Sequence, residues 1–113
     1  MEVALRRVTL VVKPFRLEDV VAALLPFEPR GLIVSECRGY GRQKGHLDLY
    51  QGSEYSITFL PKARVEFSIS AHRWKEAVEA AAEAARTGRI GDGKVFVQQV
   101  REVAAPGGEE AAS

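Results

Sequence analysis

The alternation of apolar and polar residues along the chain predicts six regular elements. Four segments are rich in β-branched residues and are expected to form strands, and two repeat apolar residues with the period of a helix. In chain order, we expect a strand over residues 3–12, a helix from residue 17, strands over residues 31–38 and 55–70, a helix over residues 72–86 and a strand over residues 95–103.

Each predicted helix has one apolar face. Pro26 and Pro29 are expected to end the first helix, and Pro61 is expected to interrupt the third strand. The predicted core positions are Leu17, Val20, Val21, Leu24 and Leu25 in the first helix, and Trp74, Ala77, Val78, Ala81 and Ala85 in the second.

The order strand, helix, strand, strand, helix, strand predicts an α+β fold of the ferredoxin-like βαββαβ type. Its four-stranded antiparallel sheet would carry both helices on one face. The segments VTLVV and VEFSI, residues 8–12 and 65–69, cannot both alternate cleanly between core and water. We therefore expect self-association to cover the face of the sheet that the helices leave open.

Composition limits the classes of function that remain. The chain has 113 residues, which predicts one domain over residues 1–103 with a mobile tail over 104–113. Its single cysteine predicts a reducing, cytoplasmic location. Neither a signal peptide nor an apolar run long enough to span a membrane is apparent. A formal net charge of +1 disfavours a general nucleic-acid binder.

The segment GYGRQKGHLDLYQGSE, residues 39–54, shows little apolar periodicity and contains four glycines. Loops of this length in a compact domain are usually functional or disordered. The segment also mixes arginine, lysine, histidine, acids and tyrosine, a mixture that a passive connection does not need. We interpret it as a loop that binds a ligand or a partner.

A second glycine-rich segment, here called the glycine loop (residues 86–94), nearly matches the phosphate-binding P-loop pattern. Val95 stands where that pattern needs Ser or Thr, and the loop follows a helix instead of opening one. Gly88 as a helix cap and Asp92-Gly93 as a turn would explain two of the glycines. Three glycines flanked by Arg89 and Lys94 fit a nest of backbone N–H groups that binds an anion.

Other motifs are weaker. Residues 38–41, RGYG, match the opening of an RNA-recognition motif, but the aromatic residues that would stack on bases do not follow. A dinucleotide fingerprint fails because Lys44 stands at its third glycine. Cys37, within a predicted strand, fits a small buried hydrophobe better than a nucleophile. His46 and His72 lack ligand-spaced partners, and no activated nucleophile or carboxylate pair favours catalysis.

Four stretches together resemble the PII signal-transduction family: KPFRLEDV (13–20), GYGRQKGHLDLYQGSEY (39–55), FLPKARVEF (59–67) and ARTGRIGDGKVFV (85–97). The resemblance implies a non-enzymatic homotrimer that binds ATP or ADP between subunits, with 2-oxoglutarate joining Mg²⁺-ATP. It also implies a T-loop over about residues 40–54. This loop would select partners such as an ammonium transporter, a nitrogen-metabolism enzyme or a kinase, and transporter binding would recruit the protein to the membrane.

The resemblance also implies roles for individual residues. Gln43 would help to coordinate Mg²⁺ through ATP, Lys62 would pair with a carboxylate of 2-oxoglutarate beside Gln43 and Lys44, and Tyr55 matches a tyrosine that some members have uridylylated. The implied nucleotide-binding residues are Gly39, Arg42, Gln43, Thr87, Gly88, Arg89, Gly91, Asp92, Gly93 and Lys94.

The chain departs from the family at two places. Many members end the last strand with two arginines that reach the nucleotide of the neighbouring subunit, whereas this chain has Ala-Ala-Pro-Gly at residues 104–107. Ile33 replaces a threonine often found near the nucleotide. The departures favour weaker triphosphate binding and leave open a divergent sensor of ADP or AMP linked to a transporter.

Overall fold

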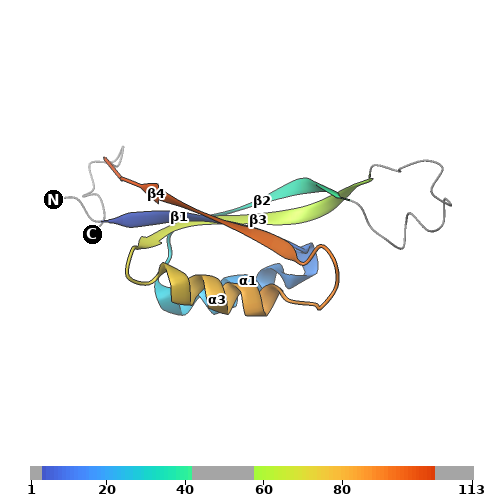
Figure 1. Ribbon diagram of the computed structural model, residues 1–113, viewed down its shortest axis with the longest axis horizontal. Helices are drawn as coiled ribbons and strands as arrows, with labels where there is room; N and C mark the ends of the chain where they lie inside the picture. Colours follow the sequence, from blue (N-terminus) through green and yellow to red (C-terminus); the bar gives the residue numbers. More distant parts are fainter. Residues whose placement is uncertain (1–3, 42–57, 104–113) are drawn as a thin grey trace.

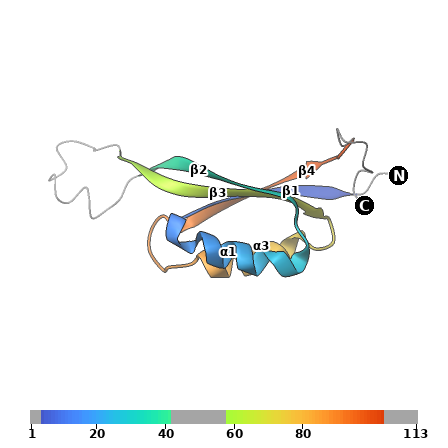
Figure 2. The same ribbon diagram turned by 180° about the vertical axis from the view of Figure 1, so that it is seen from behind.

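A computed structural model describes residues 4–41 and 58–103 of the protein. Four strands form one antiparallel sheet in the order β2-β3-β1-β4. The strands are β1 (Leu5–Val12), β2 (Arg30–Gly41), β3 (Thr58–Ser70) and β4 (Gly93–Val100). Helices α1 (Leu17–Leu24) and α3 (Trp74–Ala85) lie side by side on one face of the sheet (Figures 1 and 2). The ferredoxin-like α+β prediction is confirmed.

The core lies between the helices and the two central strands. Alternate residues of β1 and β3 point into it, as a half-buried sheet requires. Alanines on α3 have no bulk beyond Cβ, so this helix approaches the sheet and α1 closely. The core consists of Val8, Leu10, Val12, Val20, Leu24, Ala63, Val65, Phe67, Ile69, Ala77, Ala81 and Ala85.

The other face of the sheet, here called the open face, is more polar than the sequence analysis predicted. VEFSI alternates cleanly, because Val65, Phe67 and Ile69 are buried while Glu66 and Ser68 point to the open face. Of the two segments, only VTLVV fails to alternate cleanly, because the apolar Val11 points to the open face. The apolar residues on the open face of the described strands include Val11, Ile33 and Phe96, and the last two are about half exposed.

Pro61 does not interrupt β3, contrary to expectation. The pairing of β1 with β3 ends at Val12 and Ala63, so Pro61 pairs only with Arg38 of β2. A proline is tolerated where one side of a strand has no neighbour, because its missing N–H breaks no ladder bond there. Strands β2 and β3 therefore continue beyond the rest of the sheet as a two-stranded ribbon (Figure 1).

Some predicted boundaries were wrong. Strand β2 runs to Gly41 and so includes the first residues of the segment interpreted as a loop, while β4 begins at Gly93 and ends at Val100. Leu25 is 60% exposed and lies outside the core, because α1 gives way at this residue to a 3-10 turn, η2 (Leu25–Phe27). A similar turn, η1 (Pro14–Arg16), precedes α1. Among the described helices, none is long and apolar enough to cross a bilayer.

Candidate functional site

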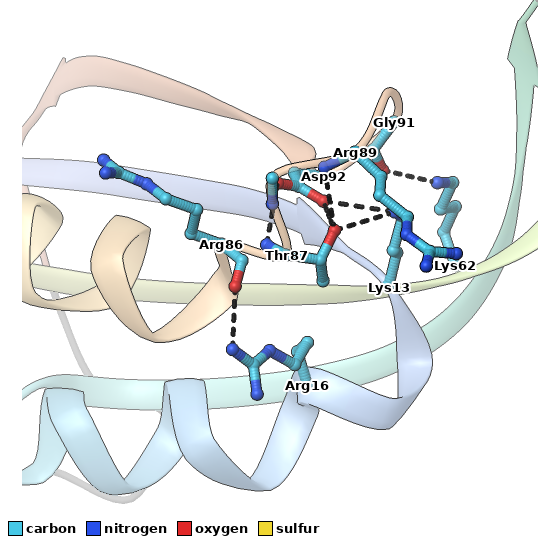
Figure 3. Close-up of polar contacts among 9 residues, drawn as sticks. Lys13, Arg16, Lys62, Arg86, Thr87, Arg89, Gly91 and Asp92 are labelled. Carbon is cyan, nitrogen blue, oxygen red and sulfur yellow. Dashed lines mark hydrogen bonds and ion pairs between the residues drawn. The ribbon is translucent and has the colours of Figure 1, made fainter.

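Three segments that are distant in sequence meet where β1 ends. Lys13 directly follows β1, Lys62 lies on β3, and the glycine loop connects α3 to β4. Figure 3 shows the side chains of Lys13, Lys62 and Arg89 gathered beside Gly91 and Asp92. Pairing of Val12 with Gly93 brings the end of β1 to the end of the glycine loop.

Asp92 is the centre of the hydrogen bonds within the loop. Its Oδ2 accepts the backbone N–H groups of Thr87, at 2.8 Å, and of Gly88, at 2.9 Å. Its Oδ1 accepts the hydroxyl of Thr87 and lies 3.1 Å from the ammonium of Lys13. The carboxylate thus folds the first half of the loop around itself.

The Thr87 hydroxyl uses all of its bonding capacity. It donates to Asp92, and it accepts the ammonium of Lys13 at 3.1 Å and the N–H of Arg89 at 3.2 Å. The side-chain and backbone hydrogen bonds from Thr87, with smaller contributions from Lys13 and Gly88, hold the pKa of the Asp92 carboxyl well below its usual range. Asp92 is therefore ionised at any physiological pH.

The second half of the loop remains open. Within the described part of the chain, the N–H groups of Ile90 and Gly91 have no hydrogen-bond acceptor. Arg89 has no carboxylate within ion-pair distance among the same residues. Lys13, Lys62 and Arg89 surround a single carboxylate, so this end of the molecule carries net positive charge and free amide donors.

Gly93 is required where the loop joins β4. Its φ of 148° lies outside the range that side chains favour, and a Cβ there would stand 2.3 Å from the carbonyl oxygen of Val11. Gly91 has a φ of 84° and brings its carbonyl to Lys62. These two glycines therefore fix the path of the loop over the end of β1.

Lys62 donates a hydrogen bond from its ammonium to the carbonyl oxygen of Gly91 at 2.9 Å. Its stem crosses Gly39 of β2, where an added Cβ would lie only 3.0 Å from Cγ of Lys62. Gly39 thus leaves room for the lysine to reach the glycine loop. The two residues come from separate predicted sites, and the fold places them in contact.

Arg16 and Lys13 were missed as residues of this site. Arg16 donates to the carbonyl oxygen of Arg86 at 2.7 Å, immediately before the loop turns away from α3. The KPFR segment therefore anchors the glycine loop at both Lys13 and Arg16. The sequence signalled this segment through the KPFRLEDV stretch that resembles the PII family and through its position directly after a strand, but neither gave Lys13 or Arg16 a role. A hollow of about 510 Å³ lies beside it, lined by Lys13, Phe15, Arg16, Arg86, Thr87 and Arg89.

The structure brings together most of the predicted residues that it describes. Thr87, Gly88, Arg89, Gly91 and Asp92 share the loop, and Gly39 and Lys62 adjoin it. Lys94 lies on β4 opposite Val11, exposed on the open face. The remaining predicted residues, Arg42, Gln43, Lys44 and Tyr55, lie outside the described residues.

Comparisons with known proteins agree with this geometry. A family model described as Nitrogen regulatory protein P-II matches residues 5–106. The chain is 46% identical to the nitrogen regulatory protein GlnK of Escherichia coli K12 over 99 residues, 88% of each protein. It is 48% identical to the nitrogen regulatory protein P-II of Rhizobium etli over 90 residues, 80% of each.

The crystal structure of Arabidopsis thaliana PII bound to citrate is similar in fold, with a TM-score of 0.73 and 31% sequence identity. The similarity covers 96% of this chain and 86% of that one. Members of the matched family are signal-transduction regulators and not enzymes. The chain belongs to the nitrogen regulatory protein P-II family.

Proposed function

We propose that this protein senses adenine nucleotides and transmits their binding to nitrogen-metabolism partners without catalysing a reaction. The observation that carries the proposal is the second half of the glycine loop, where the N–H groups of Ile90 and Gly91 lack acceptors among the described residues and cationic side chains gather. Amide donors and ammonium groups together bind phosphate oxygens well.

The nucleotide site would use the glycine loop as its phosphate cradle. Gly91 and Gly93 permit close backbone approach, Lys94 supplies a point charge, and Arg89 adds a second cation. Thr87, Gly88 and Asp92 shape the first half of the loop, and Gly39 lies on the adjoining strand. Arg42 and Gln43, outside the described residues, would complete the site, with Gln43 helping to hold Mg²⁺ on ATP.

The proposed second effector is 2-oxoglutarate, which would bind to Lys62, Gln43 and Lys44 when Mg²⁺-ATP is present. Support comes from the position of the Lys62 ammonium, which lies on the glycine loop where a carboxylate can replace its bond to Gly91. A polycarboxylate, citrate, is bound by the Arabidopsis relative.

The assembly and partners follow from the same proposal. A cytoplasmic homotrimer would cover Val11, Ile33 and Phe96 on the open face, and the T-loop of residues 40–54 would contact a transporter, a nitrogen-metabolism enzyme or a kinase. Tyr55 would be the site of any modification of that loop. Light scattering that finds a monomer at micromolar concentration would contradict the trimer.

A second candidate function is a sensor of ADP or AMP that acts on a membrane transporter without responding to 2-oxoglutarate. The Ala-Ala-Pro-Gly sequence at residues 104–107 favours it, because the family's two phosphate-binding arginines are missing there. Each charge-assisted hydrogen bond to phosphate is worth about 1.5–3 kcal/mol. The missing arginines should therefore weaken the binding of ATP, which carries the most phosphate charge, more than that of ADP or AMP.

Calorimetric titration with ATP, ADP and AMP, each with and without 2-oxoglutarate, tests both candidates. We expect Lys94→Ala to weaken ATP binding by at least tenfold while leaving the trimer intact, because one charged phosphate contact is removed. Unchanged affinity would make the glycine loop a simple turn. Steady release of ADP or phosphate during the titration would identify an enzyme instead.

A further inference from the structure

The carboxylate of Asp92 is already fully occupied within the chain. A carboxylate offers about four lone-pair sites. Here four donors fill them: the O–H and N–H of Thr87, the N–H of Gly88 and the ammonium of Lys13. No site remains to accept a donor from a ligand or to share a ligand's metal ion, and its negative charge would repel phosphate.

We propose that Asp92 is a positioning residue and not a nucleotide ligand: its carboxylate is the chain's own anion, which fills the first half of the glycine loop and directs an external phosphate to the second half. The inference rests on the proposed function, since it assigns the role of one residue in the nucleotide site. It divides a loop that the sequence presents as a single nest into a filled part and an open part.

The filled part removes three competing amide donors from the site. Asp92 binds the N–H groups of Thr87 and Gly88, and Thr87 binds the N–H of Arg89. The next two N–H groups, those of Ile90 and Gly91, have no acceptor among the described residues and stay available. An incoming phosphate therefore meets donors that are already oriented, and little ordering is needed on binding.

Asp92 also determines what Lys13 does. The ammonium of Lys13 is 3.1 Å from both Asp92 and Thr87, and its side chain is only 17% exposed. Its charge is thus neutralised within the chain and ties the end of β1 to the loop. Lys62, by contrast, donates to an uncharged carbonyl and keeps its net charge for an anion.

Asp92→Asn tests the inference because it changes one oxygen for an NH₂ group at nearly constant volume. Whichever way the amide turns, two of the four donors lose their acceptor. Glu18→Gln is the matched control: it also removes one negative charge, from the first turn of α1, but Glu18 is exposed and has no ion pair among the described residues. Both variants and the wild type would be titrated with ATP by calorimetry, and amide hydrogen exchange would be followed without nucleotide.

We expect Asp92→Asn to weaken ATP binding about tenfold and to accelerate exchange at Thr87 and Gly88, while Glu18→Gln changes neither. Thr87→Val, which keeps the carboxylate but removes the bridging hydroxyl, should shift both measurements in the same direction by less. Agreement of the two measurements in both variants would separate positioning from general loss of stability, which would also accelerate exchange in the core strands.

Two results would overturn the role inferred for Asp92 and leave the proposed function standing. One is weaker ATP binding by Asp92→Asn with unchanged exchange, which would make Asp92 a direct ligand. The other is equal or tighter ATP binding despite faster exchange, which would make the carboxylate a competitor of phosphate. Wild-type protein that binds no ATP would instead overturn the proposed function, and the inference with it.

Discussion

The two connections from helix to strand in this fold are held in place by different contacts. The turn from α1 to β2, at residues 25–29, is held from outside by Arg73, which directly precedes α3. Arg73 donates to the carbonyl oxygen of Pro26 at 3.3 Å, lies 5.5 Å from the centre of the Phe27 ring and pairs loosely with Glu28. The equivalent connection from α3 to β4 is closed from inside, by Asp92.

The difference teaches how a fold keeps one turn available for binding. The first turn packs Phe27 against the core and carries an αL residue, Glu28, with a φ of 56°. The glycine loop buries no large side chain, and its carboxylate binds Thr87 and Gly88 of the loop itself. Among the described residues, the amides of Ile90 and Gly91 therefore stay open. The two turns lie at opposite ends of the helices (Figure 2), so each can be altered without direct contact with the other.

Replacing a glycine at each of the two turns should change the free energy of unfolding most, and by different amounts. Gly93→Ala places a Cβ 2.3 Å from the carbonyl oxygen of Val11 and should lower the free energy of unfolding by about 3 kcal/mol. Gly31→Ala, near the first turn, has a φ of 57° but no atom within 4 Å of the added Cβ, and should cost about 1 kcal/mol. Urea unfolding measures both, and equal losses would contradict the steric argument.

Arg73→Met should loosen the first turn only. It keeps an unbranched apolar stem but removes the hydrogen bond to Pro26 and the cation over Phe27, so we expect a loss of about 1–2 kcal/mol. ATP affinity should stay within twofold, because the contacts lie far from the glycine loop. A large loss of ATP binding would show that the turns are coupled.

Acid should loosen the glycine loop. The pKa of Asp92 is lower folded than unfolded, so its contribution to stability is complete above the unfolded pKa of about 3.9 and is lost as pH falls through the folded value. The stability difference between wild type and Asp92→Asn should therefore be constant from pH 8 to about pH 5 and shrink below about pH 4. A difference that disappeared near neutral pH would point to another group.

The smallest expected effect concerns Gly39. Gly39→Ala should push the stem of Lys62 aside by a few tenths of an ångström at a small cost in stability, because the added Cβ would lie 3.0 Å from Cγ of Lys62. If Lys62 binds a carboxylate effector, 2-oxoglutarate affinity with Mg²⁺-ATP should fall a few-fold, and Lys62→Met should lower it by tenfold or more. Equal affinity in all three proteins would remove Lys62 from the site.

The order of the elements was enough to predict the fold, because four segments rich in β-branched residues and two helices with an apolar face follow one another in the βαββαβ order. The glycine loop was also predictable from its glycines and flanking cations. The hydrogen bond from Lys13 to Thr87 was not, since it joins residues 74 apart in sequence and depends on the pairing of β1 with β4. The filling of the loop by Asp92 depends equally on backbone geometry that composition does not reveal.

The bond between Lys62 and Gly91 has a mechanical consequence. From Lys62 to Thr58, strand β3 extends about 13 Å at the usual rise per residue, and there it is paired only with β2. This two-stranded ribbon is attached to the rest of the sheet at one end, near Lys62. The hydrogen bond from the Lys62 ammonium to Gly91 ties that end to the glycine loop. Over that length, a bend of about 10° near Lys62 moves the Thr58 end of the ribbon by roughly 2 Å. The 2.9 Å hydrogen bond between Lys62 and Gly91 therefore limits a movement about as large as an atomic radius at the end of the ribbon, where residues 42–57 begin and end.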